Sequence, residues 1–400
     1  MNKLKNNLML KRILITVFYL ILFKIGTYTL LPVIDREAIL KMNPTTLSNV
    51  AMLSGASLDS FSILTLGISP YILSSMAVQI LSMGILPTFK KWKKEGRDGR
   101  NKLERVTKGM AIAMAFIQGC ALIYGKNKQF ELLSNDSWIV IGILAAIMTV
   151  GTMIAIWIAG QISSEGIGHG SSVLILLNIC EGMVKSMFTG VSYAQLVDAD
   201  GWKMQVMLYG TFWIALLMIT IMVELLQKPY KVRYNIGSSK EQISYYHIKL
   251  NNAGIMPLLF ASILMAFIGG LDFEIPQLIV YGLAFILVVI LTYVYTKQSL
   301  NPKETAEDFQ RNHVYFDGIS SKKGTEEFLQ KKTLLITGIN AVVLLIYMVL
   351  PTIVNTLTKM EIGTFVQIGG TTFLVFVSIV IQLFDSLLST RHETKIETII

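Results

Sequence analysis

Ten long apolar stretches set what this chain can fold into. They lie near residues 13–31, 65–86, 109–125, 138–159, 171–190, 204–226, 254–270, 277–296, 333–351 and 364–388. Each is close to the roughly 20 residues that one helical crossing of a bilayer requires. Since 53% of the residues are apolar and only 15% are charged, against about 25% in soluble proteins, soluble, disordered and fibrous classes are excluded. We expect an all-α polytopic membrane protein with ten transmembrane helices.

The basic residues gather in every second connecting segment. The segments on the side of both termini hold 27 of the 35 Lys and Arg residues, and those on the other side hold seven. Lysine and arginine concentrate on the cytoplasmic side of membrane proteins. We therefore expect a multi-pass protein of the cell membrane with both termini in the cytoplasm and a retained first helix.

A short motif occurs twice. Residues 67–75 read GISPYILSS and residues 254–262 read GIMPLLFAS, and each copy lies in the second span of a group of five. Because five is odd, the second group would enter the membrane inverted. Glycine permits a backbone bend and proline suits the first turn of a helix, so each copy predicts a helix that starts within the membrane. A chance match and an ordinary proline kink are the alternatives.

The spans carry few groups that could do chemistry. Their ionisable residues are Lys24, Glu181, Lys185, Glu224 and Asp385, and all four histidines lie outside the spans. We therefore expect no catalytic residues, no metal site and no cofactor, so the chain is not expected to be an enzyme. The residues flanking the two motif prolines are aliphatic. They would either pack against neighbouring helices or form a hydrophobic constriction that closes by dewetting.

Five segments, in chain order, resemble signatures of the SecY family, the channel subunits of Sec translocons. They are TLGISPYILSSMAVQIL, SSEGIGHGSSVLI, IKLNNAGIMPLLFAS, NPKETAEDF and IGGTTFLV. The resemblance implies two inverted five-helix halves, 1–200 and 201–400, around a pore that passes unfolded secretory proteins. The implied partners are a Sec-type motor ATPase, small SecE-like and SecG-like membrane subunits, the unfolded precursor and the lipid bilayer, with no specific nucleic acid.

The resemblance also assigns roles to individual residues. A central hydrophobic pore ring falls on Ile68, Ile72, Ile175, Leu259 and Val375. A lateral gate falls on Gly67, Pro70, Ser75, Gly254, Pro257 and Ser262. A plug near 48–60 includes Ser48, Met52, Ser54, Gly55 and Leu58. The segment 46–62 is too weakly apolar to cross a membrane alone, so a re-entrant helix and an external loop are both compatible with it.

Two basic loops, 227–253 and 297–332, are the docking surface that the resemblance implies for a motor or a ribosome. The residues expected to dock are Lys231, Arg233, Lys240, Arg311, Lys322 and Lys323. Membrane topology alone would also demand positive charge in these loops. Within the first loop, KVRYNI and QISYYHIKL alternate in part around residues 237–239, which predicts an aromatic and basic hairpin.

Several departures from the family pattern indicate a subtype. The family loop G-I-R-P-G reads GISSK at residues 318–322, so Ser320 replaces the arginine, and His169 stands where asparagine is usual. These departures resemble the accessory SecY of Gram-positive bacteria, which exports serine-rich surface glycoproteins with its own SecA-like motor. The alternatives are a general housekeeping SecY and a secondary transporter with inverted repeats. The transporter would need polar midplane ligands that the spans do not supply.

Overall fold

The computed structural model describes residues 2–32, 61–130, 133, 137–197, 202–234, 242–270, 277–319, 321–358 and 370–396. Within these ranges, each of the ten apolar stretches coincides with a helix. These helices are α1 (Asn2–Tyr28), α4 (Ser69–Ile80), α6 (Arg97–Phe130), α7 (Trp138–Glu165), α8 (Gly170–Val197), α9 (Trp202–Leu225), α10 (Met256–Gly270), α11 (Gln277–Leu300), α13 (Lys322–Thr358) and α14 (Gly370–Ile396). Six of the described helices are long and apolar enough to cross a membrane, so the chain is a mostly helical, multi-pass membrane protein.

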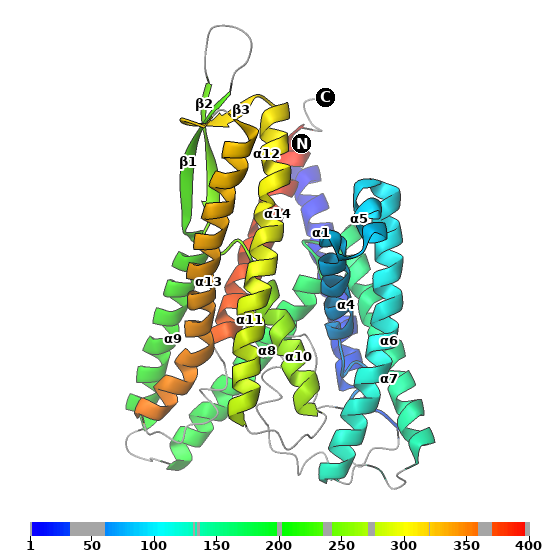
Figure 1. The fold of residues 1–400 in the computed structure, drawn as a ribbon. Coiled ribbons are helices and arrows are strands. Elements are labelled where there is room, and N and C mark those ends of the chain that lie inside the picture. Colours follow the sequence, from blue (N-terminus) through cyan, green and yellow to red (C-terminus); the bar gives the residue numbers. More distant parts are fainter. Residues whose placement is uncertain are drawn as a thin grey trace.

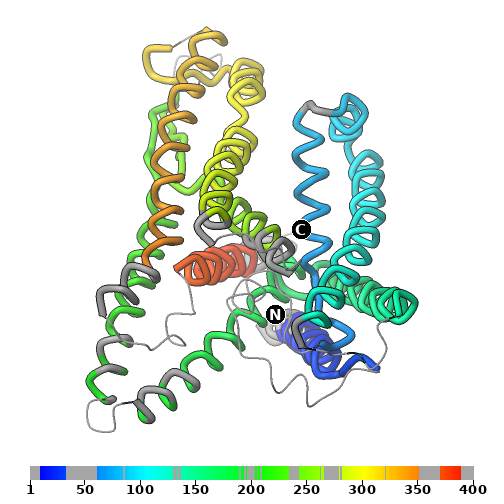
Figure 2. Tube along the Cα trace, turned by 60° about the horizontal axis from the view of Figure 1, so that its bottom comes forward, coloured from blue at the N-terminus to red at the C-terminus, as the bar shows by residue number. Residues whose placement is uncertain are grey.

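The helices form two groups. Figure 2 shows α4, α6 and α7 on one side and α9, α11 and α13 on the other. Helix α1 packs against α7 of the first group, and α14 packs against α9 and α13 of the second. Helix α10 packs against α4 and α6 of the first group and against α11 of the second. The start of α1 and the end of α14 lie at the same end of the molecule (Figure 1).

One membrane helix changes its geometry before it ends. Helix α4 continues into a π-helical turn, η1 (Leu81–Ile85), and the chain then bends by 94° into the short helix α5 (Pro87–Lys94). Proline at the start of α5 cannot donate a backbone hydrogen bond to a continuing helix, so it suits a new helix start. The bend turns the three lysines of the last turn of α5 away from the axis of α4.

A three-stranded sheet corrects the expectation of an all-α chain. Its strands are β1 (Gln227–Tyr234), β2 (Gln242–Lys249) and β3 (Val314–Phe316), in the order β2-β1-β3. The antiparallel pairing of β1 with β2 confirms the hairpin that the alternating pattern predicts. Strand β3 was not predicted, because three residues are too few to show a period. The sheet lies at the end that carries the start of α1 (Figure 1).

Three separate apolar cores hold the described residues together. The central core joins residues from both groups of helices, and a second core lies among α4's preceding turn, α6 and α7. The third, here called the sheet core, consists of Val232, Ile248, Leu300, Val314, Phe316, Leu329 and Ile336. The sheet core is roofed by α12 (Pro302–Arg311) and the first turns of α13. The sheet therefore packs against the end of α11 and the first turns of α13.

The predicted plug residues lie outside the described part of the chain. The described residues on either side of them meet, since Leu30 and Ser62 form an antiparallel bridge. The Leu31 amide also donates to the Phe61 carbonyl at 2.9 Å. The chain therefore departs from the end of α1 and returns to the same place before α4 begins.

Candidate functional site

All five residues of the predicted pore ring are buried members of the central core. Ile72 belongs to α4, Ile175 to α8, Leu259 to α10 and Val375 to α14, and Ile68 directly precedes α4. Their exposed fractions range from 0% to 7%, and all five belong to the central core. Four helices, α4, α8, α10 and α14, thus contribute these aliphatic side chains to one large buried core.

The first copy of the repeated motif starts a helix in the protein interior. Gly67 has a φ of 52°, in the left-handed region that favours glycine. Helix α4 begins two residues later with Pro70 in its first turn. The Ser69 hydroxyl donates to the Leu66 carbonyl at 2.8 Å, which satisfies one backbone group of the preceding turn. The motif therefore works as a backbone device that lets a helix start among buried side chains.

The second copy repeats this geometry. Gly254 has a φ of 65°, and α10 begins at Met256 with Pro257 in its first turn. In both copies, the glycine with positive φ lies three residues before the proline. An added Cβ at Gly254 would meet nothing within 4 Å, so the position requires glycine for its backbone angle and not for space. The matching angles strengthen the case against a chance match.

The two motif helices are neighbours, since α10 packs against α4. Pro70 is buried and Ser75 is half-buried in α4, and Pro257 is buried in α10. The structure describes the backbone of Ser262 within α10. The predicted lateral-gate residues thus lie on two adjacent helices or, for Gly67 and Gly254, in the turns directly before them. Both helices contribute to the central core.

The GIGHG segment forms a tightly packed turn between α7 and α8. The amide of Ile167 donates to the Thr16 hydroxyl of α1 at 3.1 Å, and the amide of Gly170 donates to the Ser163 hydroxyl at 2.8 Å. A Cβ at Gly170 would lie 1.9 Å from the Ala159 carbonyl oxygen. These glycines permit close packing at the helix junction, which is the ordinary role of such a segment.

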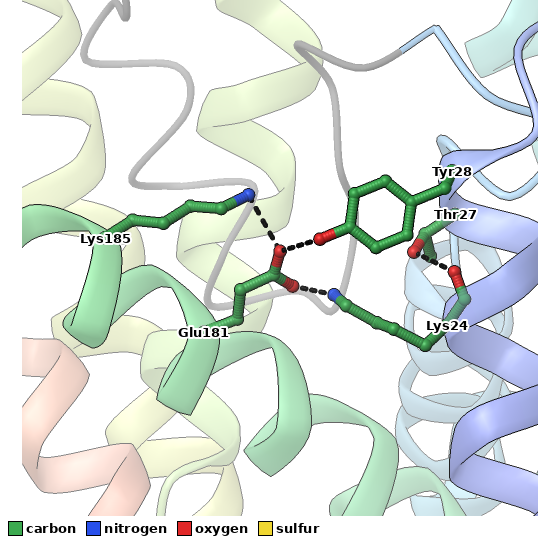
Figure 3. A network of polar contacts seen from close by, with 5 residues as sticks. All are labelled: Lys24, Thr27, Tyr28, Glu181 and Lys185. Carbon is green, nitrogen blue, oxygen red and sulfur yellow. Dashed lines mark hydrogen bonds and ion pairs between the residues drawn. The ribbon is translucent and has the colours of Figure 1, made fainter.

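A charged network within the spans was only partly anticipated by the sequence (Figure 3). Lys24 of α1 pairs with Glu181 of α8, which also pairs with Lys185 at 2.7 Å. The hydroxyl of Tyr28 donates to the same carboxylate at 3.2 Å. The i, i+4 spacing indicated the pair of Glu181 with Lys185, whereas the partner of Lys24 lies too far away in the sequence. An ionisable residue inside a span was the available signal.

A second polar network holds the start of α10. The Asn251 side chain donates to Glu224 of α9 at 2.8 Å, and Asn340 of α13 donates to Asn251 at 3.0 Å. Asn251 and Asn340 are both buried, so the hydrogen bonds offset the cost of removing these amides from water. The network joins α9 and α13 to the turn that carries Gly254. The sequence shows Glu224 as an ionisable residue within a span but does not indicate its partner.

The predicted docking residues gather around the sheet. Arg233 of β1 pairs with Asp317 at 2.7 Å, and Lys231 lies 3.9 Å from the same residue. Lys322, at the start of α13, pairs with Glu307 of α12 at 3.1 Å, and this partner holds the pKa of the Glu307 carboxyl below its usual range. Arg311 ends α12, Lys323 follows Lys322 in α13, and Lys240 lies outside the described residues. The two basic loops therefore form one structural unit.

A serine caps the helix that follows the loop in which Ser320 replaces the arginine of the family pattern. Ser320 lies outside the described residues, but Ser321 directly precedes α13. Its hydroxyl accepts a hydrogen bond from the Gly324 amide at 3.0 Å, as an N-cap residue does. Within the described residues, no group of three or more His, Cys, Asp or Glu side chains could hold a metal ion.

Comparisons with known proteins agree with this arrangement. The sequence model of the SecY family matches residues 62–384. The protein translocase subunit SecY of Streptococcus gordonii is 29% identical over 396 residues, which cover 92% of this chain and 90% of that protein. The same subunit of Staphylococcus aureus is 28% identical over 407 residues, which cover 94% of this chain and 93% of that protein.

Solved structures share the fold at lower identity. A structure described as a protein conducting channel superposes with a TM-score of 0.67 at 17% identity, covering 96% of this chain and 93% of that one. Sec61 in the canine ribosome-channel complex gives a TM-score of 0.64 at 16% identity, covering the same shares of the two chains. With the match of the family model over most of its length, the chain therefore belongs to the SecY family, and it is a membrane-embedded channel subunit of a protein translocase and not an enzyme.

Proposed function

We propose that this chain is the central subunit of an accessory Sec translocon, which passes unfolded, serine-rich surface proteins across the cell membrane. The observation that supports the channel is that α4, α8, α10, α14 and the turn before α4 bury aliphatic side chains in one central core, namely Ile68, Ile72, Ile175, Leu259 and Val375. An aliphatic ring excludes water and ions when it closes and offers no ligand for a particular solute. That chemistry suits a polypeptide of variable sequence as the cargo.

The proposed architecture has ten crossings in two inverted halves, 1–200 and 201–400, with both termini in the cytoplasm. Two observations support it: the start of α1 and the end of α14 lie at one end of the molecule, and the two motif glycines share a positive φ. The proposed plug, residues 48–60, lies between chain segments that meet at the Leu30–Ser62 bridge. A segment with joined ends could be displaced without moving α1 or α4.

Opening would follow a shift between a closed and an open state. The proposed gate lies between α4 and α10, which carry Ile72 and Leu259. An apolar signal segment of about 10 residues gains roughly 0.3–0.6 kcal/mol per residue on entering lipid, or about 3–6 kcal/mol in total. That gain would open a gate whose closed state is favoured by a few kcal/mol.

The proposed partners follow from the surfaces and from the relatives. The basic unit formed by the sheet and α12 would receive a SecA-like motor, since acidic partners are attracted to such a surface. Two of the structural relatives were solved with a ribosome: Sec61 in the canine ribosome-channel complex and the yeast Ssh1 complex bound to the yeast 80S ribosome. SecE-like and SecG-like subunits would pack against apolar helix faces toward the lipid. The loss of the family arginine at Ser320 favours a dedicated motor over the general one.

Site-specific crosslinking to a stalled precursor tests the proposal. A photoreactive residue in place of Ile72 or Leu259 should crosslink to the precursor during export, whereas one at the lipid-exposed Ile290 should not. A serine-rich precursor is expected to crosslink several times more than a general secretory precursor. Equal crosslinking of both precursors would instead favour the housekeeping role, and no crosslink at either ring position would contradict the channel path.

A further inference from the structure

A basic cavity lies where the two groups of helices approach each other near the sheet end. Its volume is about 510 Å³, within the range of about 300–1,000 Å³ that small-molecule pockets occupy. One wall is formed by η1 and α5, and the other by the end of α11 and the start of α12. Five lysines line it: Lys90, Lys93, Lys94, Lys297 and Lys303.

The charge in this cavity is not balanced by its own carboxylates. Glu304 and Glu307 also line it, so five lysines face two carboxylates and leave a formal excess of three positive charges. Glu307 is shared with Lys322, which lies outside the cavity lining and donates to it at 3.1 Å. In the described part of the chain, none of the five lysines forms an ion pair within 4 Å. Like charges held this close repel each other, so a bound anion would stabilise the arrangement.

The cavity lies at the level where a membrane presents its headgroups. Helix α11 has 24 residues and so spans about 36 Å, more than the roughly 30 Å of the hydrocarbon core. Lys297 occupies its last turn. The wall formed by η1 contributes Ser82 and Met83, directly after the end of α4. The lysines therefore lie at a membrane interface, beside the ends of two membrane helices.

An exposed apolar stripe on α11 leads to the same lysine. Ile286, Ile290 and Tyr293 are 56%, 53% and 42% exposed. With Lys297 they follow the i, i+4, i+7, i+11 spacing of one helix face. The Lys297 ammonium lies 5.8 Å from the centroid of the Tyr293 ring. This continuous apolar face can pack against acyl chains, and its end carries the positive charge of Lys297. A free phosphate has no acyl chains and would not need such a face.

We propose that this cavity binds the phosphate headgroup of an anionic phospholipid of the cytoplasmic leaflet, whose acyl chains lie along the stripe on α11. The bound headgroup ties α5 to α11 and α12, and so holds the first group of helices to the second outside the central core. The leaflet rests on the proposed orientation, whereas the binding does not depend on translocation.

Native mass spectrometry of the purified full chain measures this binding. The protein is taken from bilayers of equal parts phosphatidylglycerol and phosphatidylcholine, and the fraction that retains phosphatidylglycerol is recorded. The double variant Lys93→Gln, Lys297→Gln, with one change in each wall, should retain at least threefold less. The matched control is Lys108→Gln, Lys331→Gln, which removes one lysine from each group of helices away from the cavity and should retain as much as the unchanged protein.

Free phosphate is distinguished in a second arm. Protein in phosphatidylcholine alone is titrated with sn-glycerol 3-phosphate, and its unfolding midpoint is followed; no rise is expected, whereas added phosphatidylglycerol should raise it. A rise with glycerol phosphate equal to that with the lipid would overturn the lipid assignment, and equal retention by the two double variants would overturn the site. Crosslinking of the precursor at position 72 is independent of both results, so failure here leaves the channel proposal standing.

Discussion

Single residues in this fold act mainly by satisfying backbone or charge requirements inside an apolar medium. Gly67 and Gly254 supply positive φ angles where two helices begin. The repeated motif in the sequence predicted both of these helix starts. Glu181 neutralises a lysine of a distant helix (Figure 3). Sequence alone could flag Lys24 as an ionisable residue in a span, but it could not pair residues from two helices whose mutual rotation depends on packing.

The Glu181 network gives a stability prediction at this scale. In Glu181→Gln, two lysines lose their counter-charge while the side chain keeps its size. Since Lys24 and Glu181 are only 23% and 24% exposed, we expect a loss of about 1–3 kcal/mol in the free energy of unfolding. Lys185→Met serves as the control: its side chain is 68% exposed, and the loss should be about 0.2–1 kcal/mol. Thermal unfolding midpoints in one detergent compare the variants, and a larger loss for Lys185→Met would contradict the pairing.

At the scale of elements, the apolar stretches in the sequence predicted the positions of the helices far better than the residues at which the helices end. All ten apolar stretches coincide with helices, and the β1–β2 hairpin follows from its alternation. The polar helices α5 and α12 and strand β3 were not predicted, because their stability comes from tertiary contacts. Strand β3 illustrates this: Val314 and Phe316 are buried in the sheet core against residues from β1 and α13. No local pattern in three residues could show that.

The ring of aliphatic side chains gives a conductance prediction. Ile72→Asn places an amide in the central cluster, where it can hydrogen-bond water and keep the constriction wet. We expect the ion leak of reconstituted vesicles without precursor to rise severalfold. Ile72→Val keeps the aliphatic character and should leave the leak close to that of the unchanged protein. An asparagine variant that folds and stays as tight as the valine variant would remove Ile72 from the seal.

The sheet unit gives a pH prediction. Tyr246 lies edge-on to Phe309 and Phe316, with ring centroids at 5.4 and 6.0 Å. Burial raises the pKa of its hydroxyl, although the hydrogen bond with Thr305 acts in the opposite direction. The folded state therefore favours the protonated phenol, and this contribution is present below the ordinary tyrosine pKa of about 10 and lost as the pH rises through and above it.

Thermal unfolding between pH 8 and pH 11 measures this contribution. The midpoint of the unchanged protein should fall more steeply with pH than that of Tyr246→Phe, which cannot ionise at this position. Parallel curves for the two proteins would show that the phenol of Tyr246 does not contribute to stability at high pH.

The whole molecule combines two groups of helices, a central core and one unit built around the sheet. The inverted repeat and the family signatures predict two halves, 1–200 and 201–400, and this division stays a prediction. The sequence could not predict the basic cavity, whose lysines come from α5, α11 and α12, because only the packed fold brings these segments together. The count of Lys and Arg residues was informative only at this scale, because it adds up the residues of every connecting segment to predict the orientation of the whole chain.

Orientation is the prediction that belongs to the whole molecule. The sheet end, with both termini, should face the cytoplasm because 27 of the 35 basic residues lie in its segments. In a variant without Cys120 and Cys180, Lys331→Cys should react with a membrane-impermeant thiol reagent only in inside-out vesicles. Lys203→Cys should react only in intact cells, where the reagent reaches the outer face of the membrane. The reverse pattern would invert the proposed topology.

The sheet also constrains the order in which the protein is made. Strands β1 and β2 leave the ribosome first, but β3 follows only after α10 and α11 have been synthesised. Until then, the inner faces of Val232 and Ile248 lack the partners that bury them in the finished protein. The sheet can therefore be completed only after α10 and α11 have been inserted and the chain has returned to the sheet end. A nascent chain stalled between these helices would leave the apolar face of the β1–β2 hairpin exposed to water.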